Sequence, residues 1–150
     1  MIESVGIVGA GTMGNGIAQV CAAAGLGVTM VDISDAAVKR GLSTIDGSLD
    51  RLVKREKISA ADREAALARI VATTDKAKLA NCDLVIEAAT ENEELKVKIL
   101  KDLCATLRPQ ALVATNTSSI SITKLAAATD RPDRFIGMHF FNPVPVMALL

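Results

Sequence analysis

A glycine-rich turn near the N-terminus limits the folds open to this chain more than any other feature. A short apolar run leads directly into the G-x-G-x-x-G sequence Gly9-Ala10-Gly11-Thr12-Met13-Gly14. Gly9 allows a sharp turn off a strand, Gly11 lets a pyrophosphate approach the main chain, and Gly14 lets the next helix lie close to the sheet. The first N–H groups of that helix and its dipole favour phosphates. The motif therefore predicts a dinucleotide site that includes residues 9–14.

An aspartate after the next predicted strand supports this interpretation. Asp32 follows the apolar run 27–31 and lies 18 residues beyond Gly14. A carboxylate roughly 20 residues after the glycines commonly accepts hydrogen bonds from the adenosine ribose. Because Asp32 repels a 2′-phosphate, it favours NAD over NADP as the cofactor. The alternative is a strand–turn–helix unit with a surface aspartate at the start of a helix.

The length and the charge of the chain restrict its class. At 150 residues it suits one domain with a substantial core. The 17 Lys and Arg residues balance 17 Asp and Glu residues, so we expect no nucleic acid and no anionic membrane as a partner. The chain shows no basic leader and no run of 18 apolar residues, so we expect no signal peptide, no membrane span and a cytoplasmic or organelle-matrix location.

The cysteines and the single histidine argue against a metal site. Cys21, Cys82 and Cys104 are widely spaced and form no C-x-x-C pair. One histidine adds too few ligands for a zinc site. We therefore expect no metal, and we expect three buried free thiols.

Strand-like runs alternate with helical patterns along the chain. The strands are expected at residues 5–8, 27–31, 70–73, 84–86, 112–115 and 135–138. This alternation predicts an α/β fold with a doubly wound, parallel sheet of the Rossmann type, formed by residues 1–150 as one domain. Two successive helices over about residues 35–70 exceed what one crossover requires, so a helical hairpin should project from the domain.

Two helices carry more detailed predictions. Ser59 and Asp62 have the spacing of a capping box at the start of the second hairpin helix. In the helix that ends near Leu107, the four-residue repeat predicts a buried stripe of Leu95, Ile99, Leu103 and Leu107, with a Glu94–Lys98 pair on the outer side.

Polar residues follow three of the other strands at the points where those strands end. They are Glu87, Glu91, Asn92 and Lys96 after the fourth strand, Asn116, Ser118 and Ser119 after the fifth, and His139 and Asn142 after the sixth. The carboxyl ends of parallel strands share one edge of the sheet, where ligands of open α/β sheets bind. We therefore expect these side chains to meet the glycine turn where a nicotinamide would lie.

His139 is the candidate catalytic base. Oxidation of an alcohol by NAD requires a group that takes the hydroxyl proton, and imidazole titrates near neutral pH. Ser118 is the candidate donor to the reacting oxygen, and Asn116 could hold Ser118 or the nicotinamide carboxamide. The alternatives are a structural histidine, a helix-capping serine and a turn-stabilising asparagine.

Four stretches together resemble the NAD-dependent L-3-hydroxyacyl-CoA dehydrogenase family, and within it the bacterial 3-hydroxybutyryl-CoA dehydrogenases. They are residues 8–14, 87–92, 116–119 and 137–145, the last of which reads Gly-Met-His-Phe-Phe-Asn-Pro-Val-Pro. The resemblance implies reversible oxidation of an L-3-hydroxyacyl-CoA to the 3-ketoacyl-CoA. It implies that His139 is the catalytic histidine, that Ser118 contacts the 3-oxygen and that Asp32 binds the adenosine ribose.

The resemblance also implies roles for residues at both ends of the ligands. Glu91 and Lys96 match residues near the nicotinamide half of NAD, and Asn142 lies in the same motif as the histidine. Ser48 and Arg55 fall where the family contacts CoA through its helical hairpin. Arg55 replaces a lysine found in some members, which keeps the charge and changes the geometry. The basic residues of this hairpin otherwise suit a solvated face.

One departure concerns the C-terminal part of the family pattern. Family members place a glutamate, paired with the histidine, directly after a stretch like 146–150. They continue into a helical C-terminal domain that supplies a further asparagine, closes the cleft and forms a homodimer. Neither feature lies within residues 1–150. We therefore expect a fragment of a longer protein that binds NAD with little turnover on its own. A further alternative is a related dehydrogenase of a hydroxy acid without CoA.

Overall fold

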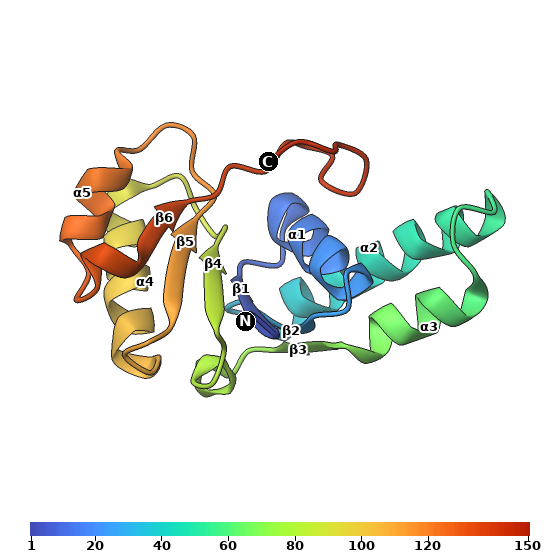
Figure 1. Ribbon diagram of the computed structural model, residues 1–150, viewed down its shortest axis with the longest axis horizontal. Coiled ribbons are helices and arrows are strands. Elements are labelled where there is room, and N and C mark those ends of the chain that lie inside the picture. Colours follow the sequence, from blue (N-terminus) through green and yellow to red (C-terminus); the bar gives the residue numbers. More distant parts are fainter.

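The computed structural model describes all 150 residues, which form a six-stranded parallel sheet with helices on both faces (Figure 1). The strands are β1 (Ser4–Val8), β2 (Gly27–Val31), β3 (Ile70–Thr73), β4 (Leu84–Glu87), β5 (Leu112–Thr115) and β6 (Phe135–Gly137). Their order is β3-β2-β1-β4-β5-β6, so the sheet grows in opposite directions from β1 and β4. This order confirms the predicted doubly wound α/β fold.

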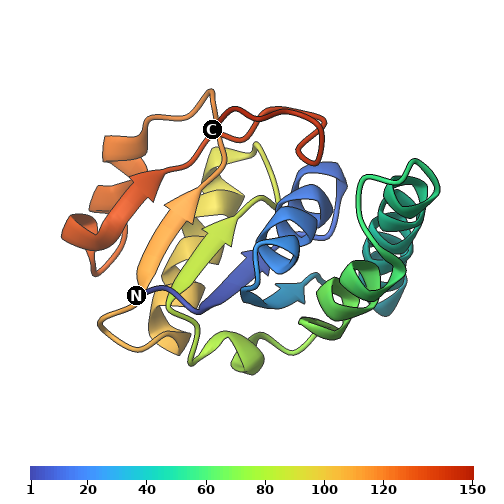
Figure 2. The ribbon, with the colours of Figure 1, turned by 45° about the vertical axis from the view of Figure 1, so that its right-hand side comes forward.

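The helices are α1 (Thr12–Ala23), α2 (Asp35–Lys54), α3 (Ala60–Ala68), α4 (Glu93–Thr106) and α5 (Ile122–Ala127), with 3₁₀ turns η1 (Lys76–Leu79) and η2 (Pro132–Arg134). Neighbouring residues of a strand point to opposite faces of the sheet, and the core divides accordingly. Ile7 packs with residues of α1 and α2, whereas Val8 packs with residues of α4. Figure 2 shows α1 in front of the sheet and α4 behind it.

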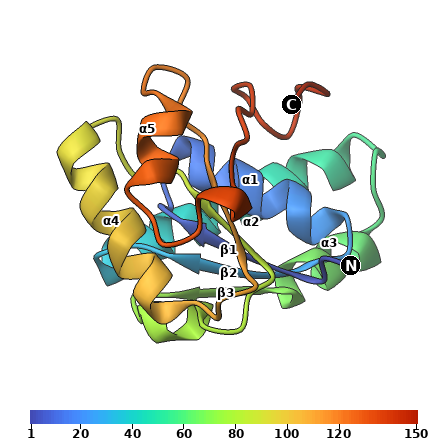
Figure 3. The same cartoon turned by 60° about the vertical axis from the view of Figure 1, so that its left-hand side comes forward.

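The predicted helical hairpin is present. Helices α2 and α3 run side by side and project beyond the sheet next to α1 (Figures 1 and 3). Arg63 of α3 pairs with Asp46 and Asp50 of α2, which ties the two helices together. Ser59 and Asp62 form the predicted capping box, with each side chain accepting a hydrogen bond of 3.0 Å from the N–H of the other residue.

The predicted buried stripe of α4 is wrong in its first half. Leu95 is 48% exposed, while Lys96 and Leu100 face the sheet and are buried. At this end of the helix the buried positions are therefore one residue later than predicted, at Lys96 and Leu100. The outer charge pair is also different, because Glu93 pairs with Lys124 of α5 and no pair joins Glu94 to Lys98.

The three cysteines are free thiols, and their burial is uneven. Cys82 and Cys104 are buried as predicted, whereas Cys21 on α1 is only partly buried. Burial nevertheless raises the pKa of Cys21 to about 11, which keeps it protonated at neutral pH. None of the helices combines the length and the apolar character that a membrane crossing needs.

Candidate functional site

The candidate site lies along the carboxyl edge of the sheet. Strand register places Val31, Val8, Glu87, Thr115 and Gly137 in one row across β2, β1, β4, β5 and β6. The next residues of each strand therefore leave the sheet at the same level. The glycine turn leaves from β1, between β2 and β4, which is the point where the strand order reverses. Ligands of such sheets bind at this point.

Two glycines of the turn are required by the protein itself. Gly9 has a φ of +110°, and a Cβ there would lie 2.6 Å from the carbonyl oxygen of Ala88. A Cβ on Gly14 would lie 1.8 Å from the carbonyl oxygen of Gly9. Glycine is therefore required at position 9 by its backbone conformation and by the loop after β4, and at position 14 because α1 starts so close to the turn.

Gly11 is different, because nothing in the protein requires glycine there. Its φ of −71° suits any residue, and a Cβ would meet no atom within 4 Å. Gly11 is the N-cap of α1, and no side chain caps the free N–H groups of that helix. The open space in front of these N–H groups suits a ligand that approaches the main chain closely and carries negative charge.

Asp32 bridges the glycine turn and the start of α2. Its carboxylate accepts hydrogen bonds from the N–H of Ala10 at 2.8 Å and from the N–H of Ile33 at 2.6 Å. Two cavities meet at this carboxylate. The α2 cavity, of about 320 Å³, lies between the turn and α2 and is lined by Ala10, Gly11, Asn15, Asp32, Ala37, Arg40, Gly41 and Thr44.

The second cavity, the α4 slot of about 330 Å³, lies on the other side of Asp32. Its apolar walls come from Val8, Gly9, Val31, Ile33, Ala89, Ile99 and Leu103. Lys76, which pairs with Asp102, also lines it. Ile33 is 97% exposed although it is apolar. An exposed isoleucine beside an apolar slot suits contact with a flat ring. The sequence analysis missed this slot, and the one available signal was an isoleucine directly after Asp32.

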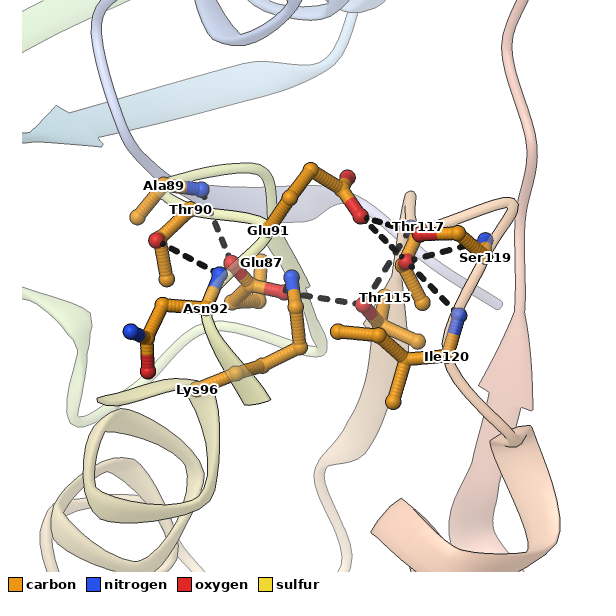
Figure 4. Close-up of polar contacts among 10 residues, drawn as sticks. All are labelled: Glu87, Ala89, Thr90, Glu91, Asn92, Lys96, Thr115, Thr117, Ser119 and Ile120. Atoms are coloured by element: carbon orange, nitrogen blue, oxygen red, sulfur yellow. Dashed lines mark hydrogen bonds and ion pairs between the residues drawn. The ribbon is translucent and has the colours of Figure 1, made fainter. Parts of the chain in front are cut away.

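Beneath the site, Glu87 and Lys96 form a buried ion pair (Figure 4). Their side chains are 0% and 1% exposed. Glu87 also accepts hydrogen bonds from the hydroxyl of Thr115 at 2.8 Å and from the N–H of Ala89 at 2.8 Å. The pair joins β4, α4 and β5 under the loop that carries Glu91. Lys96 thus points inward, and its predicted contact with the cofactor stays a prediction.

Glu91 connects the loops that follow β4 and β5. Its carboxylate accepts hydrogen bonds from the hydroxyls of Thr117 at 2.7 Å and Ser119 at 2.9 Å (Figure 4). Burial pushes the pKa of Glu91 upward, but these hydroxyls and the positive charges of Lys96 and His139 together hold that pKa below its ordinary value. Glu91 is therefore ionised at neutral pH, on the same edge as the histidine.

Asn116 fixes the segment that carries His139. Its side-chain oxygen accepts a hydrogen bond of 2.9 Å from the N–H of Phe140, and the N–H of Met138 donates to the carbonyl of Thr115 at 2.9 Å. The histidine is thus held between two anchored neighbours. His139 is exposed, and its ring lies 4.8 Å from the ring of Phe141. Ser118 is exposed at the end of the neighbouring strand.

A third cavity, the hairpin cavity of about 240 Å³, brings together three other predicted residues. Ser48 and Arg55 of the α2 segment line it from one side, and Asn142 lines it from the C-terminal segment. Thr12 and Arg51 also line this cavity, whereas Met13 packs against the core. Arg51 and Arg55 make no ion pair, while neighbouring Lys54 pairs with Asp50 at 2.9 Å. The hairpin therefore presents two unpaired guanidinium groups to the hairpin cavity.

Comparisons with known proteins agree on one family. Residues 4–150 match the family described as 3-hydroxyacyl-CoA dehydrogenase, NAD binding domain. The chain belongs to this family. It is 55% identical over 150 residues to a 3-hydroxybutyryl-CoA dehydrogenase of Bradyrhizobium diazoefficiens, covering all of this chain and 51% of that protein. It is 47% identical over 145 residues to a probable 3-hydroxybutyryl-CoA dehydrogenase of Deinococcus radiodurans, covering 97% of this chain and 52% of that protein.

A solved structure shows the same arrangement of the chain. The crystal structure of (S)-3-hydroxybutyryl-CoA dehydrogenase from Ralstonia eutropha is similar with a TM-score of 0.98 and 65% sequence identity. The match covers 99% of this chain and 53% of that one. The chain therefore spans about half the length of these three 3-hydroxybutyryl-CoA dehydrogenases.

The family identifies NAD as the cofactor of this domain, and the residues present fit that group. The open approach to Gly11 suits a pyrophosphate, and Asp32 lies where two ribose hydroxyls could donate to it. The α4 slot next to Asp32 offers apolar walls for the adenine ring. Glu91, Asn116 and His139 occupy the opposite end of the same edge.

Proposed function

We propose that the protein containing this chain catalyses the NAD-dependent, reversible oxidation of an L-3-hydroxyacyl-CoA, such as 3-hydroxybutyryl-CoA, to the 3-ketoacyl-CoA. The observation that carries the proposal is the position of His139. Asn116 anchors it at the end of β6, on the sheet edge that begins with the glycine turn. Membership of the 3-hydroxyacyl-CoA dehydrogenase family supports the reaction and the substrate class.

In this proposal His139 acts as the general base. Bound NAD supplies the hydride acceptor. An imidazole nitrogen of His139 takes the proton of the 3-hydroxyl as C3 loses its hydride, and returns that proton in the reverse reaction. Ser118 donates a hydrogen bond to the 3-oxygen and so holds it near the imidazole. Glu91 places an ionised carboxylate on the same edge of the sheet as this imidazole.

Asn116 and Asn142 have further proposed roles at the carboxyl edge of the sheet. Asn116 positions the histidine through the N–H of Phe140, and its amide nitrogen remains free to donate to the nicotinamide carboxamide. We assign Asn142, which also lines the hairpin cavity, and Glu91 to the nicotinamide half of NAD. Lys96 is buried against Glu87, so it serves this half of the site by holding the loop of Glu91 in place. Gly9, Gly11, Thr12, Met13 and Gly14 form the turn that receives the pyrophosphate.

The hairpin cavity suits the CoA end of the substrate. CoA carries phosphates, and Arg51 and Arg55 offer unpaired guanidinium groups beside the hydroxyl of Ser48. We therefore assign Ser48 and Arg55 to CoA binding. We further propose that residues 1–150 are an NAD-binding domain of a cytoplasmic homodimer, whose dimer contacts come from residues outside this chain.

The proposal is tested by assaying acetoacetyl-CoA reduction with NADH by the full-length protein and by His139→Ala. We expect the substitution to lower kcat by about 100-fold or more, since general acid–base catalysis contributes about 10²–10⁴. NADH binding, followed by nicotinamide fluorescence, should persist in the variant and shows that it is folded. An unchanged rate in the variant removes His139 from the mechanism.

Two alternatives give different results in the same assays. An NAD-binding module without turnover binds NADH but never oxidises it with acetoacetyl-CoA. A dehydrogenase of a hydroxy acid without CoA reduces a simple 3-keto acid as fast as its CoA ester. In that case replacing Ser48 and Arg55 leaves activity unchanged, whereas our proposal expects the KM for acetoacetyl-CoA to rise.

A further inference from the structure

The α2 cavity contains a backbone donor that an anion could use. Ala10 lines the cavity, and its N–H donates to the carboxylate of Asp32 at 2.8 Å. The second donor to that carboxylate is the N–H of Ile33, a residue that lines the α4 slot. The carboxylate is thus a resident anion, at the position where a ribose hydroxyl of the proposed cofactor would approach.

Arg40 lines the same cavity and has no partner. It lies on the second turn of α2, is exposed, and forms no ion pair with any carboxylate, Asp32 included. An unpaired guanidinium on the wall of a cavity is available to a ligand that carries phosphate. Lys39, its neighbour in sequence, faces elsewhere and lines a different cavity with Leu42, Ser43 and Asp46.

The close packing of α2 on the glycine turn keeps the main chain of Arg40 near Ala10. A Cβ on Gly41 would lie 2.7 Å from the carbonyl oxygen of Ala10 and 3.0 Å from its Cβ. Glycine at position 41 therefore lets the helix touch the turn, although glycine within a helix is unfavourable by about 1 kcal/mol relative to alanine. Arg40 is consequently positioned by backbone contact.

We propose that Asp32 and Arg40 act in opposition on the adenosine ribose, so that cofactor choice depends on their balance. Asp32 accepts from the ribose hydroxyls and repels a 2′-phosphate, while Arg40 attracts that phosphate. Removal of the carboxylate frees the N–H of Ala10 in the cavity that Arg40 lines and converts the α2 cavity into a 2′-phosphate site. This inference rests on the proposed NAD site and assigns a specificity role to a residue outside the glycine motif.

The experiment measures the Kd of NADH and of NADPH by nicotinamide fluorescence for the full-length protein. The variants are Asp32→Ser, Arg40→Gln and the double variant. Asp32→Ser should bind NADPH at least about tenfold more tightly than the wild type, which is the scale of one charge-assisted contact. Arg40→Gln should weaken NADPH more than NADH, and the double variant should lose most of the gain.

Two further variants test whether the changes in Kd are specific to Arg40 and to the carboxylate of Asp32. Lys39→Gln removes the same charge from the same helix and should change neither Kd by more than about twofold, because Lys39 lines a different cavity and exposed charges are screened by water and salt. Asp32→Asn keeps an oxygen that can accept from Ala10, so it serves if Asp32→Ser unfolds, and it should show a smaller gain in NADPH affinity. Both are checked by thermal unfolding.

The outcomes distinguish a failure of this inference from a failure of the proposed function. If the wild type binds NADH, but removal of the carboxylate in Asp32→Ser or Asp32→Asn gives no gain in NADPH affinity, the inference is wrong and the proposed function stands. The inference is also wrong if Arg40→Gln and Lys39→Gln lower NADPH affinity equally. If the wild type binds neither dinucleotide, the proposed function itself fails.

Discussion

Replacing Glu87 by glutamine should destabilise the domain far more than breaking an ion pair on its surface. Glu87→Gln keeps the size of the side chain but only one acceptor oxygen, whereas Glu87 uses one oxygen for Thr115 and the other for the N–H of Ala89. It removes the charge that faces Lys96, whose side chain is 1% exposed. An unpaired buried charge costs about 3–5 kcal/mol. For a domain of this size, that is a fall in Tm of roughly 10 °C.

A matched control lies on α4, the helix that carries Lys96. Asp102 of α4 pairs with Lys76, and their side chains are 53% and 56% exposed. Asp102→Asn should cost less than about 1 kcal/mol, because exposed ion pairs are screened by water and salt. The double variant Glu87→Gln/Lys96→Met should recover much of the loss, since it removes the stranded charge together with its partner.

The assay is thermal and urea unfolding of each variant, followed by circular dichroism. We expect the Tm of Glu87→Gln to be well below that of Asp102→Asn. The Tm of the double variant should fall between those of Glu87→Gln and the wild type. Equal losses for Glu87→Gln and Asp102→Asn would refute the reasoning, because burial would then make no difference to the value of the pair.

Three other predictions follow from local geometry. Gly11→Ala should leave the free energy of unfolding within about 1 kcal/mol of the wild type, since its Cβ points into open space. It should nevertheless weaken NADH binding at least about tenfold in a fluorescence titration. Equal NADH affinity would contradict a close approach of the cofactor at Gly11. Asn116→Ala should lower kcat by about tenfold or more, because small displacements of a catalytic group are costly, whereas Asn116→Asp keeps the acceptor for Phe140 and should retain more activity in steady-state assays. The N–H groups of Glu3 and Ser4 lower the pKa of Asp83 from 3.8 to about 2, so its stabilising contribution is present above pH 3.8 and is lost as the pH falls towards 2. The stability difference between wild type and Asp83→Asn, from urea midpoints at several pH values, should therefore shrink as the pH falls from about 4 to 2, and a constant difference would contradict this assignment.

The parts of the fold set by local patterns were predictable from the sequence. The spacing of Gly9, Gly11 and Gly14 before a helix, and of Asp32 after the next apolar run, reflects requirements that act within about 20 residues. The same holds for the capping box of Ser59 and Asp62, whose two hydrogen bonds join residues three positions apart.

The parts that depend on contacts between distant residues were not predictable. Lys96 in a helical pattern indicates a solvent-facing charge, and its burial becomes apparent only when α4 packs over Glu87. Arg131 is 4% exposed, and its guanidinium donates to the carbonyls of Cys104, Arg108 and Ala111 near the end of α4. The hydrogen bond from Phe140 to Asn116 spans 24 residues and positions His139. No periodicity encodes such contacts, since each depends on how separate elements meet.

A crystal structure of the full-length protein with bound NAD tests the central claim most directly. We predict that the pyrophosphate lies against the N–H groups at Gly11, that the adenosine ribose donates to Asp32, and that the nicotinamide ring lies beside Asn116 and His139. A nicotinamide that points away from His139, or a dinucleotide bound anywhere other than the glycine turn, would contradict the account.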